Sequence, residues 1–568
     1  MRILVLDAHA NASLAIVQSL GRAGHDLGLA GPSPNPVSWK SRYPQQRWSY
    51  SDPLQDPEAF TAWLVEIQRT RSFDFILPVT DRSIYPAMKL LREGWGEGFL
   101  VLPPVDAFDW VYDKSKTMDL ARDCDVRIPS GVEIDSHDWS VGDFSRFPYF
   151  AKPVQSKVWS RGGGHNLSPR LARDPTELAR AVDTFLTHGT VSVQEYISGW
   201  GVGLAVLCQD GDVLNWFAYR RVHEYPLTGG ASTYRVSMEP PAGLVEASSR
   251  MMEKIRWSGV AMIEFKEHHG DLVLMEINGR FWGSLPLAIA AGVDFPRQLI
   301  DLLAHGSRPA QPTDYRRGLF VRRIDTDFAW FKDNLRADKA DRLLLTRPVG
   351  RSLVEPLRVL GGNEHWDHAS WRDPAPIVTL IARTLGEEFG RWWRRLQGWL
   401  LLRSARFTSR RRLRRRPMRK VLILCYGNIC RSPYVETYLR SILNTDDLVI
   451  RSAGFHQKGG RQTPGNFAQI AEKTGVSLGE HRSSVMDPQL VDWADAIVIM
   501  DRDNWRRLRI FGRQAMRKAV WLGACLASGS VELSDPYSRD EAEMTAIADR
   551  MRAASQELAV QLAGRQPS

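Results

Sequence analysis

The sequence predicts a multidomain α/β protein, in which a Rossmann-like domain and an α+β domain precede a doubly wound parallel sheet. At 568 residues the chain is too long to form a single hydrophobic core. Short apolar runs at 3–6, 75–77 and 421–424 have the composition of buried parallel strands. A strongly basic segment at 391–420 separates the last of these strands from the rest of the chain.

Composition restricts the compartment and the partners. Residues 391–420 hold thirteen Arg or Lys and no acid, so the net charge of +10 is concentrated there. The five cysteines are scattered, which indicates a reducing compartment, and no CxxC or HxxH pattern favours zinc. The sequence contains neither a signal peptide nor an apolar run of about 18 residues. The expected location is the cytoplasm, and nothing outside the basic segment favours nucleic acid.

Residues 1–105 are expected to form the Rossmann-like domain. A strand at 2–7 is followed by Asn11-Ala12-Ser13, which suit a helix start, and then by apolar residues at helical spacing. A second buried strand at 75–77 precedes Thr80-Asp81. No GxGxxG motif is present, so nothing favours a dinucleotide.

Residues 106–306 carry their densest chemical signal in a predicted β-hairpin, 261–280. Glu276 and Asn278 are two residues apart on one strand, so both point to the same face. If the loop runs from His269 to Asp271, Glu264 lies directly across from Glu276. Two acids and an amide oxygen suit Mg²⁺, with nucleotide phosphates completing the octahedron. A loop that differed by one residue would break this pairing.

This ordered set of a lysine, three glutamates, an asparagine and an arginine resembles the ATP-grasp superfamily, in which a domain like 1–105 usually precedes the ATP-grasp domain. The resemblance implies that bound ATP is held by Lys114, Lys152, Glu195, Tyr196 and Ile197, with Lys116 as an alternative to Lys114. It implies that Mg²⁺ is held by Glu264, Glu276 and Asn278, and that Arg280 stabilises an acyl-phosphate transition state. The reaction implied is ATP-dependent activation of a small carboxylate, followed by attack of an amine or thiol.

The next two segments are harder to interpret. Residues 307–390 are expected to extend the ligase at its C-terminus. Residues 391–418 are expected to form a hinge, in which tryptophans, leucines and arginines could lie on an anionic membrane surface. The alternative is a solvated linker with a helix that packs on the ligase domain.

A loop at 425–431 follows the strand at 421–424 and precedes a predicted helix. Its backbone N–H groups and the helix N-terminus form a cradle for an anion. Arg431 offers a planar fork that matches a phosphate. The same electropositive surroundings favour a thiolate at Cys425, and a thiolate beside a bound phosphoryl group predicts nucleophilic attack on phosphorus.

The string Cys-x-Gly-Asn-x-Cys-Arg-Ser-Pro at 425–433 is similar to the signature of the low-molecular-weight protein tyrosine phosphatases, which would occupy 419–568. Family-like stretches follow at 452–454, 481–483, 500–504 and 535–537. The resemblance implies Cys425 as nucleophile, Arg431 as phosphate clamp, Asn428 and Ser432 as supports of the loop and thiolate, and Asp535 as general acid. It also implies that Cys430 can form a reversible disulfide with Cys425, and it implies no cofactor for this half.

The sequence therefore predicts a bifunctional protein, with an ATP-grasp ligase at 1–306 and a tyrosine phosphatase at 419–568. The expected partner is a phosphotyrosine protein, for which a bacterial tyrosine kinase or the machinery of surface-polymer export are candidates. Three alternatives stay open: an ATP-grasp domain that binds nucleotide without ligation and regulates the phosphatase, an arsenate reductase-like C-terminal domain, and an adaptor held on a membrane by 391–420. A thioredoxin-coupled arsenate reductase shares the loop but needs a further cysteine pair, and only Cys525 follows Cys430.

Overall fold

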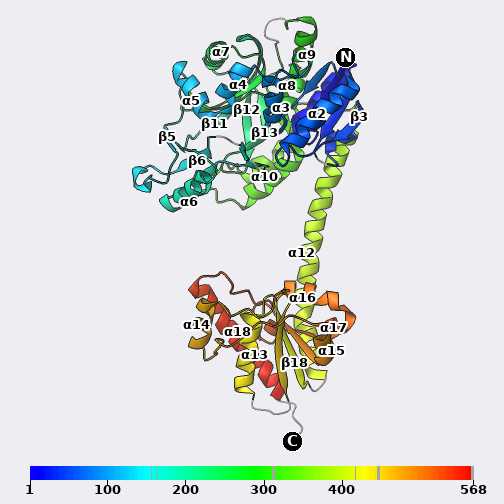
Figure 1. The fold of residues 1–568 in the computed structure, drawn as a ribbon, viewed down its shortest axis with the longest axis vertical. Coiled ribbons are helices and arrows are strands. Elements are labelled where there is room, and N and C mark those ends of the chain that lie inside the picture. The colour runs from blue at the N-terminus through cyan, green and yellow to red at the C-terminus, as the bar shows by residue number, and fades with distance from the viewer. Residues whose placement is uncertain are drawn as a thin grey trace. The chain divides into compact units, whose positions relative to one another are not determined.

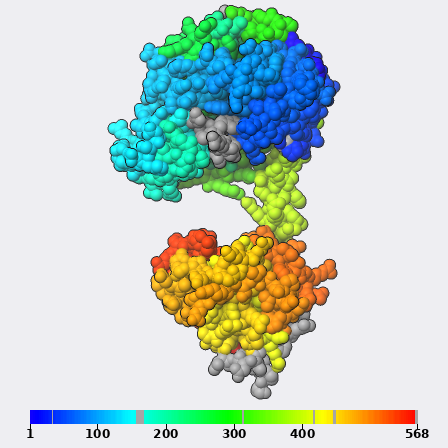
Figure 2. Space-filling model, in the orientation of Figure 1, coloured from blue at the N-terminus to red at the C-terminus, as the bar shows by residue number. Residues whose placement is uncertain are grey.

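The computed structural model of this chain describes residues 1–32, 34–154, 157–160, 163–309, 314–415, 418–443 and 448–563. The chain divides into two compact units, Met1–Leu385 and Gly386–Ser568. Within each unit the atoms are closely packed (Figure 2). Each unit is described by itself below.

The first unit begins with the predicted Rossmann-like domain, a parallel sheet in the order β3-β2-β1-β4. Its elements are β1 (Arg2–Val5), α1 (Asn11–Arg22), β2 (Asp26–Gly31), η1 (Val37–Lys40), β3 (Pro44–Ser49), α2 (Pro57–Arg71), β4 (Phe75–Leu77) and α3 (Asp81–Arg92). The strands alternate with helices, as this fold class requires, and the strands β1, β2 and β4 are almost wholly buried.

Asp7, which follows β1, holds the chain that leaves β4. Its fully buried Oδ2 accepts hydrogen bonds from the backbone N–H groups of Val79 (3.1 Å) and Thr80 (2.7 Å) and from the hydroxyl of Ser83 (2.6 Å). These bonds fix the first turn of α3, which begins at Asp81. Asp81 is thereby held at the carboxyl edge of the sheet, where it meets the candidate ligase site.

A small antiparallel sheet in the order β5-β10-β6-β9 follows, and Figure 1 labels its strands β5 and β6. The elements of this region are α4 (Val105–Tyr112), α5 (Lys114–Asp123), β5 (Gly131–Ile134), η2 (Val141–Asp143), β6 (Tyr149–Pro153), β7 (Lys157–Ser160), β8 (Gly163–Asn166), β9 (Arg170–Ala172), α6 (Pro175–Leu186) and β10 (Val191–Glu195). Lys152 lies on β6 and pairs with Ser192 of β10. Lys152 therefore lies on an interior strand of this small sheet.

A seven-stranded sheet in the order β15-β14-β11-β12-β13-β16-β17 forms the centre of the unit. Its strands are β11 (Trp200–Gln209), β12 (Asp212–Tyr225), β13 (Ala231–Ser237), β14 (Gly259–His268), β15 (Asp271–Asn278), β16 (Phe320–Arg322) and β17 (Glu364–Trp366), with helices α7 (Leu244–Lys254), α8 (Leu285–Ala291) and α9 (Phe295–His305). The α/β fold class expected for this half is thus observed.

The β14–β15 hairpin differs from the predicted one in its loop. His268 pairs with Asp271, so the turn is the two residues His269 and Gly270, with φ of 52° and 89°. This is the backbone of a primed turn rather than the predicted three-residue loop. A register shift between Glu264 and the next residue then restores the predicted pairing of Glu264 with Glu276. The expected neighbours therefore face each other through a tight turn combined with a bulge.

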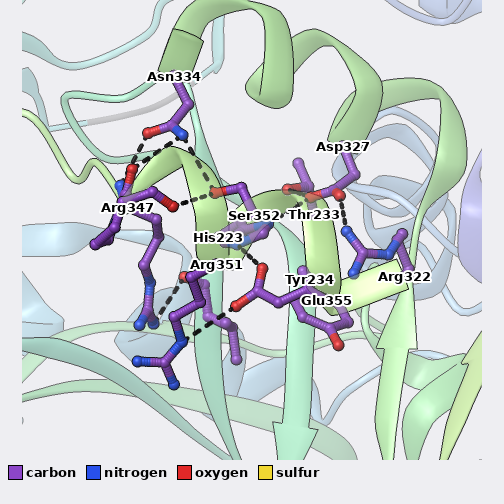
Figure 3. Close-up of polar contacts among 12 residues, drawn as sticks. His223, Thr233, Tyr234, Arg322, Asp327, Asn334, Arg347, Arg351, Ser352 and Glu355 are labelled. Atoms are coloured by element: carbon purple, nitrogen blue, oxygen red, sulfur yellow. Dashed lines mark hydrogen bonds and ion pairs between the residues drawn. The ribbon is translucent and has the colours of Figure 1, made fainter. Parts of the chain in front are cut away.

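The C-terminal extension packs on β12 and β13 through buried charges (Figure 3). It comprises β16, α10 (Ile324–Arg336), α11 (Val349–Val354), η3 (Glu355–Gly361) and β17. The ring of His223 on β12 stacks on Trp330, with centroids 3.4 Å apart. Its two nitrogens lie 2.9 Å from Asp327 Oδ1 and 3.0 Å from Glu355 Oε2. Asp327 also pairs with Arg322 and accepts a hydrogen bond from the Thr233 hydroxyl (2.8 Å).

The second unit is the predicted doubly wound parallel sheet, in the order β19-β18-β20-β21. Its elements are β18 (Lys420–Cys425), α13 (Arg431–Ile442), β19 (Val449–Gly454), α14 (Gly465–Lys473), α15 (Pro488–Trp493), β20 (Ala496–Ile499), α16 (Arg502–Leu508), η4 (Arg509–Phe511), α17 (Gly512–Lys518), β21 (Ala519–Trp521), η5 (Leu522–Ala524) and α18 (Glu541–Ala563). Cys425 is the last residue of β18, a central strand of the sheet.

Most of the predicted hinge, 391–418, lies in helix α12 (Ala375–Arg415). Beyond Gly386, one face of α12 packs on the second unit, where Leu401, Leu402 and Ala405 join a cluster that includes Trp521. The Ser409 hydroxyl accepts the Trp521 N–H at 3.0 Å.

Arginines of α12 add to this attachment. Arg406 donates to the carbonyls of Ala527 (2.9 Å) and Gly529 (2.8 Å), and Arg410 donates to those of Ala524 (3.2 Å) and Leu526 (3.0 Å). Part of the basic run is thus a helix that is bound to the C-terminal sheet domain. Residues 416–417 of the predicted hinge lie outside the described residues. No helix of the described chain combines the length and apolar character that crossing a bilayer would need.

Replacing Asp327 with Ala tests the buried contacts of the extension. The substitution leaves Arg322 and His223 buried without this carboxylate, so we expect it to lower the free energy of unfolding by about 3–5 kcal/mol. Urea unfolding followed by tryptophan fluorescence would measure the change. The exposed Glu97→Ala is the control, expected within about 0.5 kcal/mol of wild type. Equal stabilities of Asp327→Ala and wild type would contradict the assigned role.

Candidate active sites

The loop between β18 and α13 holds Cys425 at the carboxyl edge of the C-terminal sheet. Cys425 is 3% exposed, and the Asn428 backbone N–H donates to its Sγ at 3.1 Å. The Ser432 hydroxyl lies 3.0 Å from the same sulfur. Both groups can donate a hydrogen bond to the sulfur, as a thiolate nucleophile requires. The structure thus brings together three of the predicted residues.

Asn428 holds the loop in shape from its centre. Its φ is 51°, a left-handed conformation that asparagine tolerates better than most residues. Its side-chain nitrogen donates to the hydroxyls of Ser432 (2.9 Å) and Ser452 (2.8 Å), and its side-chain oxygen accepts the Ser484 N–H at 2.7 Å. His481 Nε2 lies 2.8 Å from the Asn428 carbonyl oxygen. The family-like stretches at 452–454 and 481–483 therefore lie against the loop.

Arg431 begins α13 and is almost wholly buried. Its guanidinium forms ion pairs with Asp535 and Asp501 and donates to the Leu533 carbonyl at 3.2 Å. Burial alone would lower the pKa of Arg431, but Cys425, Asp535 and Asp501 together raise it. A permanently charged guanidinium therefore interacts electrostatically with Cys425 and pairs with the predicted general acid.

Asp535 and Cys430 occupy different environments near this loop. The Asp535 side chain is 44% exposed, so solvent and substrate can reach it, and one of its oxygens accepts the Tyr537 N–H at 3.2 Å. Cys430 is 3% exposed, and burial raises the pKa of its thiol. Both Cys425 and Cys430 are free thiols here. Their reversible disulfide stays a prediction.

The candidate ligase site lies on one face of the seven-stranded sheet. Glu264 and Glu276 are cross-strand partners, and Arg221 forms an ion pair with Glu264. Gly201 and Gly203 on the intervening strand β11 leave room for this contact. A Cβ at Gly201 would lie 2.7 Å from Arg221 Cδ, and one at Gly203 would lie 2.4 Å from the ring of Tyr219. The glycines therefore let long side chains lie across the sheet.

The other predicted residues of this face form a hydrogen-bonded chain. The Asn278 side-chain nitrogen donates to Glu276 at 3.0 Å, and its oxygen accepts from Arg280 at 2.9 Å. Arg280 Nε also donates to Asp81 Oδ1 at 2.6 Å. Burial alone would lower the pKa of Arg280, but Asp81 and its other neighbours raise it. The first helix turn held by Asp7 thus contributes an acid to the site.

The predicted phosphate-binding lysines, Lys114 and Lys152, are half-buried near these residues. Burial and the charge of Lys114 lower the pKa of Lys152 to about 8, although Glu276 and Glu264 raise it. Lys114 lines a small cavity with Glu276 and Asn278, whereas Lys116 lies near Asp109 on the exposed side. The structure therefore brings Lys114, and not its alternative, to the predicted metal ligands.

A cavity of about 450 Å³ connects these groups. Its lining includes Lys152, Ile197, Arg221, Glu264, Lys266, Glu276, Asn278 and Arg280. Glu195 does not line this cavity. Its carboxylate instead accepts a hydrogen bond from the Ser130 backbone N–H at 2.8 Å. Tyr196 packs beside Phe150, with ring centroids 6.0 Å apart. Gly162 of a glycine-rich stretch near this region lies outside the described residues.

The residues present fit a divalent cation. Burial and the nearby carboxylate of Glu276 raise the pKa of Glu264 to about 7, although Arg221 lowers it. Burial alone would raise the pKa of Glu276, but Lys114, Asn278 and Lys152 lower it. Two half-buried carboxylates side by side are hard ligands whose repulsion a Mg²⁺ ion would relieve, and the Asn278 oxygen, which accepts from Arg280 here, is the third candidate ligand. No cluster of three or more His, Cys, Asp or Glu ligands occurs among the described residues.

Three polar residues of these sites were not assigned roles from the sequence. Asp81 and Asp501 each follow a buried strand, and that position was the available signal for both. Arg221 lies within a long strand, where no sequence motif marks it, and its ion pair with Glu264 appears only in the structure.

Comparisons with known proteins match both halves. Residues 420–567 match the sequence model described as "Low molecular weight phosphotyrosine protein phosphatase", and residues 189–327 match "ATP-grasp in the biosynthetic pathway with Ter operon". Both resemblances expected from the motifs are thus confirmed. They indicate a tyrosine phosphatase domain at 420–567 and an ATP-grasp domain that includes 189–327.

Individual relatives cover single halves. Low molecular weight protein-tyrosine-phosphatase Etp of Escherichia coli K12 is 28% identical over 142 residues, which are 25% of this chain and 93% of Etp. Ptp of Acinetobacter johnsonii is 28% identical over 124 residues, 22% of this chain and 84% of Ptp. The solved L-amino acid ligase from Bacillus licheniformis is 16% identical with a TM-score of 0.40, covering 53% of this chain and 74% of that one.

Asp501→Asn tests the unassigned partner of Arg431. The amide keeps the oxygen that accepts the Asn504 N–H at the start of α16 but loses the charge that pairs with Arg431. We expect kcat/KM for p-nitrophenyl phosphate to fall roughly tenfold, because the guanidinium loses one of its two anchoring carboxylates. The exposed Asp492→Asn is the control. Full activity of Asp501→Asn would contradict an orienting role.

Proposed function

We propose that the second unit hydrolyses phosphotyrosine through a cysteinyl-phosphate intermediate. The observation that carries this proposal is the convergence of Cys425, Arg431 and Asp535. The sulfur has two potential hydrogen-bond donors, the guanidinium interacts with it electrostatically, and the partly exposed carboxylate pairs with the guanidinium. A nucleophile, an anion clamp and an accessible acid are the three groups that this reaction needs.

The proposed chemistry proceeds in two displacements. The Cys425 thiolate attacks phosphorus while the P–O bond to the tyrosine ring breaks, and protonated Asp535 gives its proton to the departing phenolate. The Asp535 carboxylate then takes a proton from a water molecule, which attacks phosphorus and releases phosphate and the thiolate. Arg431 binds the equatorial oxygens in both steps, and the Ser432 hydroxyl stabilises the thiolate as it leaves.

Substitutions of the two reacting groups test this assignment. Cys425→Ser is expected to abolish p-nitrophenyl phosphate hydrolysis, and Asp535→Asn to lower kcat by about 10²–10⁴-fold, the usual contribution of general acid–base catalysis. Cys525→Ala and Asp540→Asn are the matched controls, since both residues lie outside the site. An active Cys425→Ser would rule out the phosphatase mechanism, and arsenate reduction would then be assayed as the alternative.

We infer that the first unit catalyses Mg-ATP-dependent activation of a carboxylate for attack by an amine. Lys114 and Lys152 would bind the phosphates, Ile197 would contact the base, and Glu264, Glu276 and Asn278 would hold the metal. Bound Mg²⁺ would supply charge neutralisation at the phosphates. Arg280, anchored by Asp81, is positioned to stabilise negative charge that develops on the transferring group. The buried, charge-rich cavity supports this inference.

Glu276→Gln tests the ligase half independently of the phosphatase. The amide lacks the charge that attracts a divalent cation, so we expect ADP release in the presence of candidate amino acids to fall at least about 10²-fold. The exposed Glu253→Gln is the control. Equal ADP release by Glu276→Gln and wild type would contradict the metal assignment. ATP binding by wild type without ADP release would instead favour the alternative of a regulatory nucleotide-binding domain.

The expected partners and location stay predictions. They are a phosphotyrosine protein, such as a bacterial tyrosine kinase or a component of surface-polymer machinery, in the cytoplasm. The membrane contact predicted for 391–420 stays a prediction, for which the exposed Trp392, Trp393 and Trp399 on α12 are the candidate side chains. Arginines of the same helix are engaged with the second unit, which leaves a smaller basic surface for lipid.

A further inference from the structure

A second basic surface lies on the C-terminal sheet domain, outside the segment 391–420. Residues 502–518 hold seven Arg or Lys and one acid. Four of these arginines are exposed on α16, η4 and α17, and they define the α16–α17 basic surface: Arg506, Arg509, Arg513 and Arg517. Within the described part of the chain none of the four forms an ion pair, whereas Arg502 pairs with Glu532 at 2.9 Å.

The unpaired positive charge of this surface destabilises the folded unit unless a bound partner neutralises it. Neighbouring like charges repel, and the four arginines have no acidic partners among the described residues to offset that repulsion. Arg509 lies over the ring of Trp505, 5.2 Å from its centroid, which orients the arginine without neutralising it. Ile510, in the middle of the surface, is 84% exposed. A cationic surface with an exposed apolar side chain is suited to a partner that carries carboxylates.

The surface adjoins the catalytic loop. The Arg507 guanidinium lies 4.5 Å from the ring centroid of Tyr426, the residue that follows Cys425. Tyr426 is 40% exposed and also contacts His456 edge to face, with ring centroids 5.7 Å apart. Helix α16 therefore lies next to the rim of the loop that would bind the phosphoryl group. A polypeptide whose phosphotyrosine enters the loop would have its neighbouring residues within reach of these arginines.

We propose that the α16–α17 basic surface binds acidic residues that flank the phosphotyrosine, so that the phosphatase selects phosphotyrosines in acidic sequence. The proposal rests on the proposed phosphatase function of the same unit and adds the class of its protein substrate. The attraction is expected mainly to raise the association rate and to lower KM, because exposed charges speed association. Salt screens these charges and weakens the effect. The chemical step at Cys425 needs none of the four arginines.

Paired phosphopeptides test this selectivity on the full-length protein. Two peptides share a central phosphotyrosine and differ only in flanks, which carry Asp and Glu in one peptide and Gln in the other. We expect kcat/KM at low salt to be about tenfold higher for the acidic peptide. We expect the triple variant Arg506→Glu/Arg509→Glu/Arg513→Glu to abolish or reverse that preference, and 0.5 M salt to suppress it in wild type.

Arg419→Glu is the matched control. Arg419 is exposed and precedes the amino end of β18, whereas Cys425 ends the same strand, so this reversal changes charge at the opposite edge of the sheet. It should retain the peptide preference. Hydrolysis of p-nitrophenyl phosphate, which has no flanks, reports whether the catalytic loop works in each protein, so an inactive wild type would refute the phosphatase function itself.

Other results would overturn the docking proposal while leaving the phosphatase intact. Equal kcat/KM for the two peptides, or a preference that survives in the triple variant, would each do so. Sedimentation with phosphatidylserine vesicles is measured in parallel. Loss of vesicle binding in the triple variant without any change in peptide selectivity would assign the surface to an anionic membrane and overturn the proposal.

Discussion

A charged group that is largely removed from water has to be paired, and in both candidate sites arginines meet this constraint by pairing with carboxylates. In the second unit the guanidinium of Arg431 lies between Asp501 and Asp535. In the first unit Arg221 contacts Glu264, and Arg280 contacts Asp81. Removing one partner of such a pair costs more than the pair contributes, so the surrounding strands and helix starts are held in one arrangement.

The same constraint explains how distant parts of the first unit are held together. The extension binds the central sheet through charged pairs around His223 and Arg322, and Asp373 accepts hydrogen bonds from Gln18 (3.1 Å) and Ser41 (2.7 Å) of the N-terminal domain. These charged pairs and hydrogen bonds depend on the orientation of the interacting groups as well as on their burial. They specify a particular packing, whereas apolar contacts alone tolerate several.

The sequence was sufficient for the parts of the molecule that are set by local patterns. The parallel strands and the seven-residue span of the loop at 425–431 follow from spacing, whereas the predicted pairing of Glu264 with Glu276 is reached only through a bulge that spacing does not predict. The hairpin loop was predicted one residue too long, because a tight turn combined with a bulge gives the same pairing as a longer loop. Asp81, Arg221 and Asp501 were assigned no role, because each contacts a residue that is far away in the sequence. The separations are 199 residues to Arg280, 43 to Glu264 and 70 to Arg431, respectively.

Helix α12 has a consequence for where the second unit can be separated from the rest of the chain. The matched family region begins at residue 420, yet Ala405, Ser409 and Leu413 upstream of it are buried against the sheet domain. A fragment cut at the family boundary would expose the apolar surface that these residues cover. The family match thus begins the domain at residue 420, whereas the packing begins it upstream, within α12. A truncated protein should therefore keep the part of α12 that packs on the sheet domain.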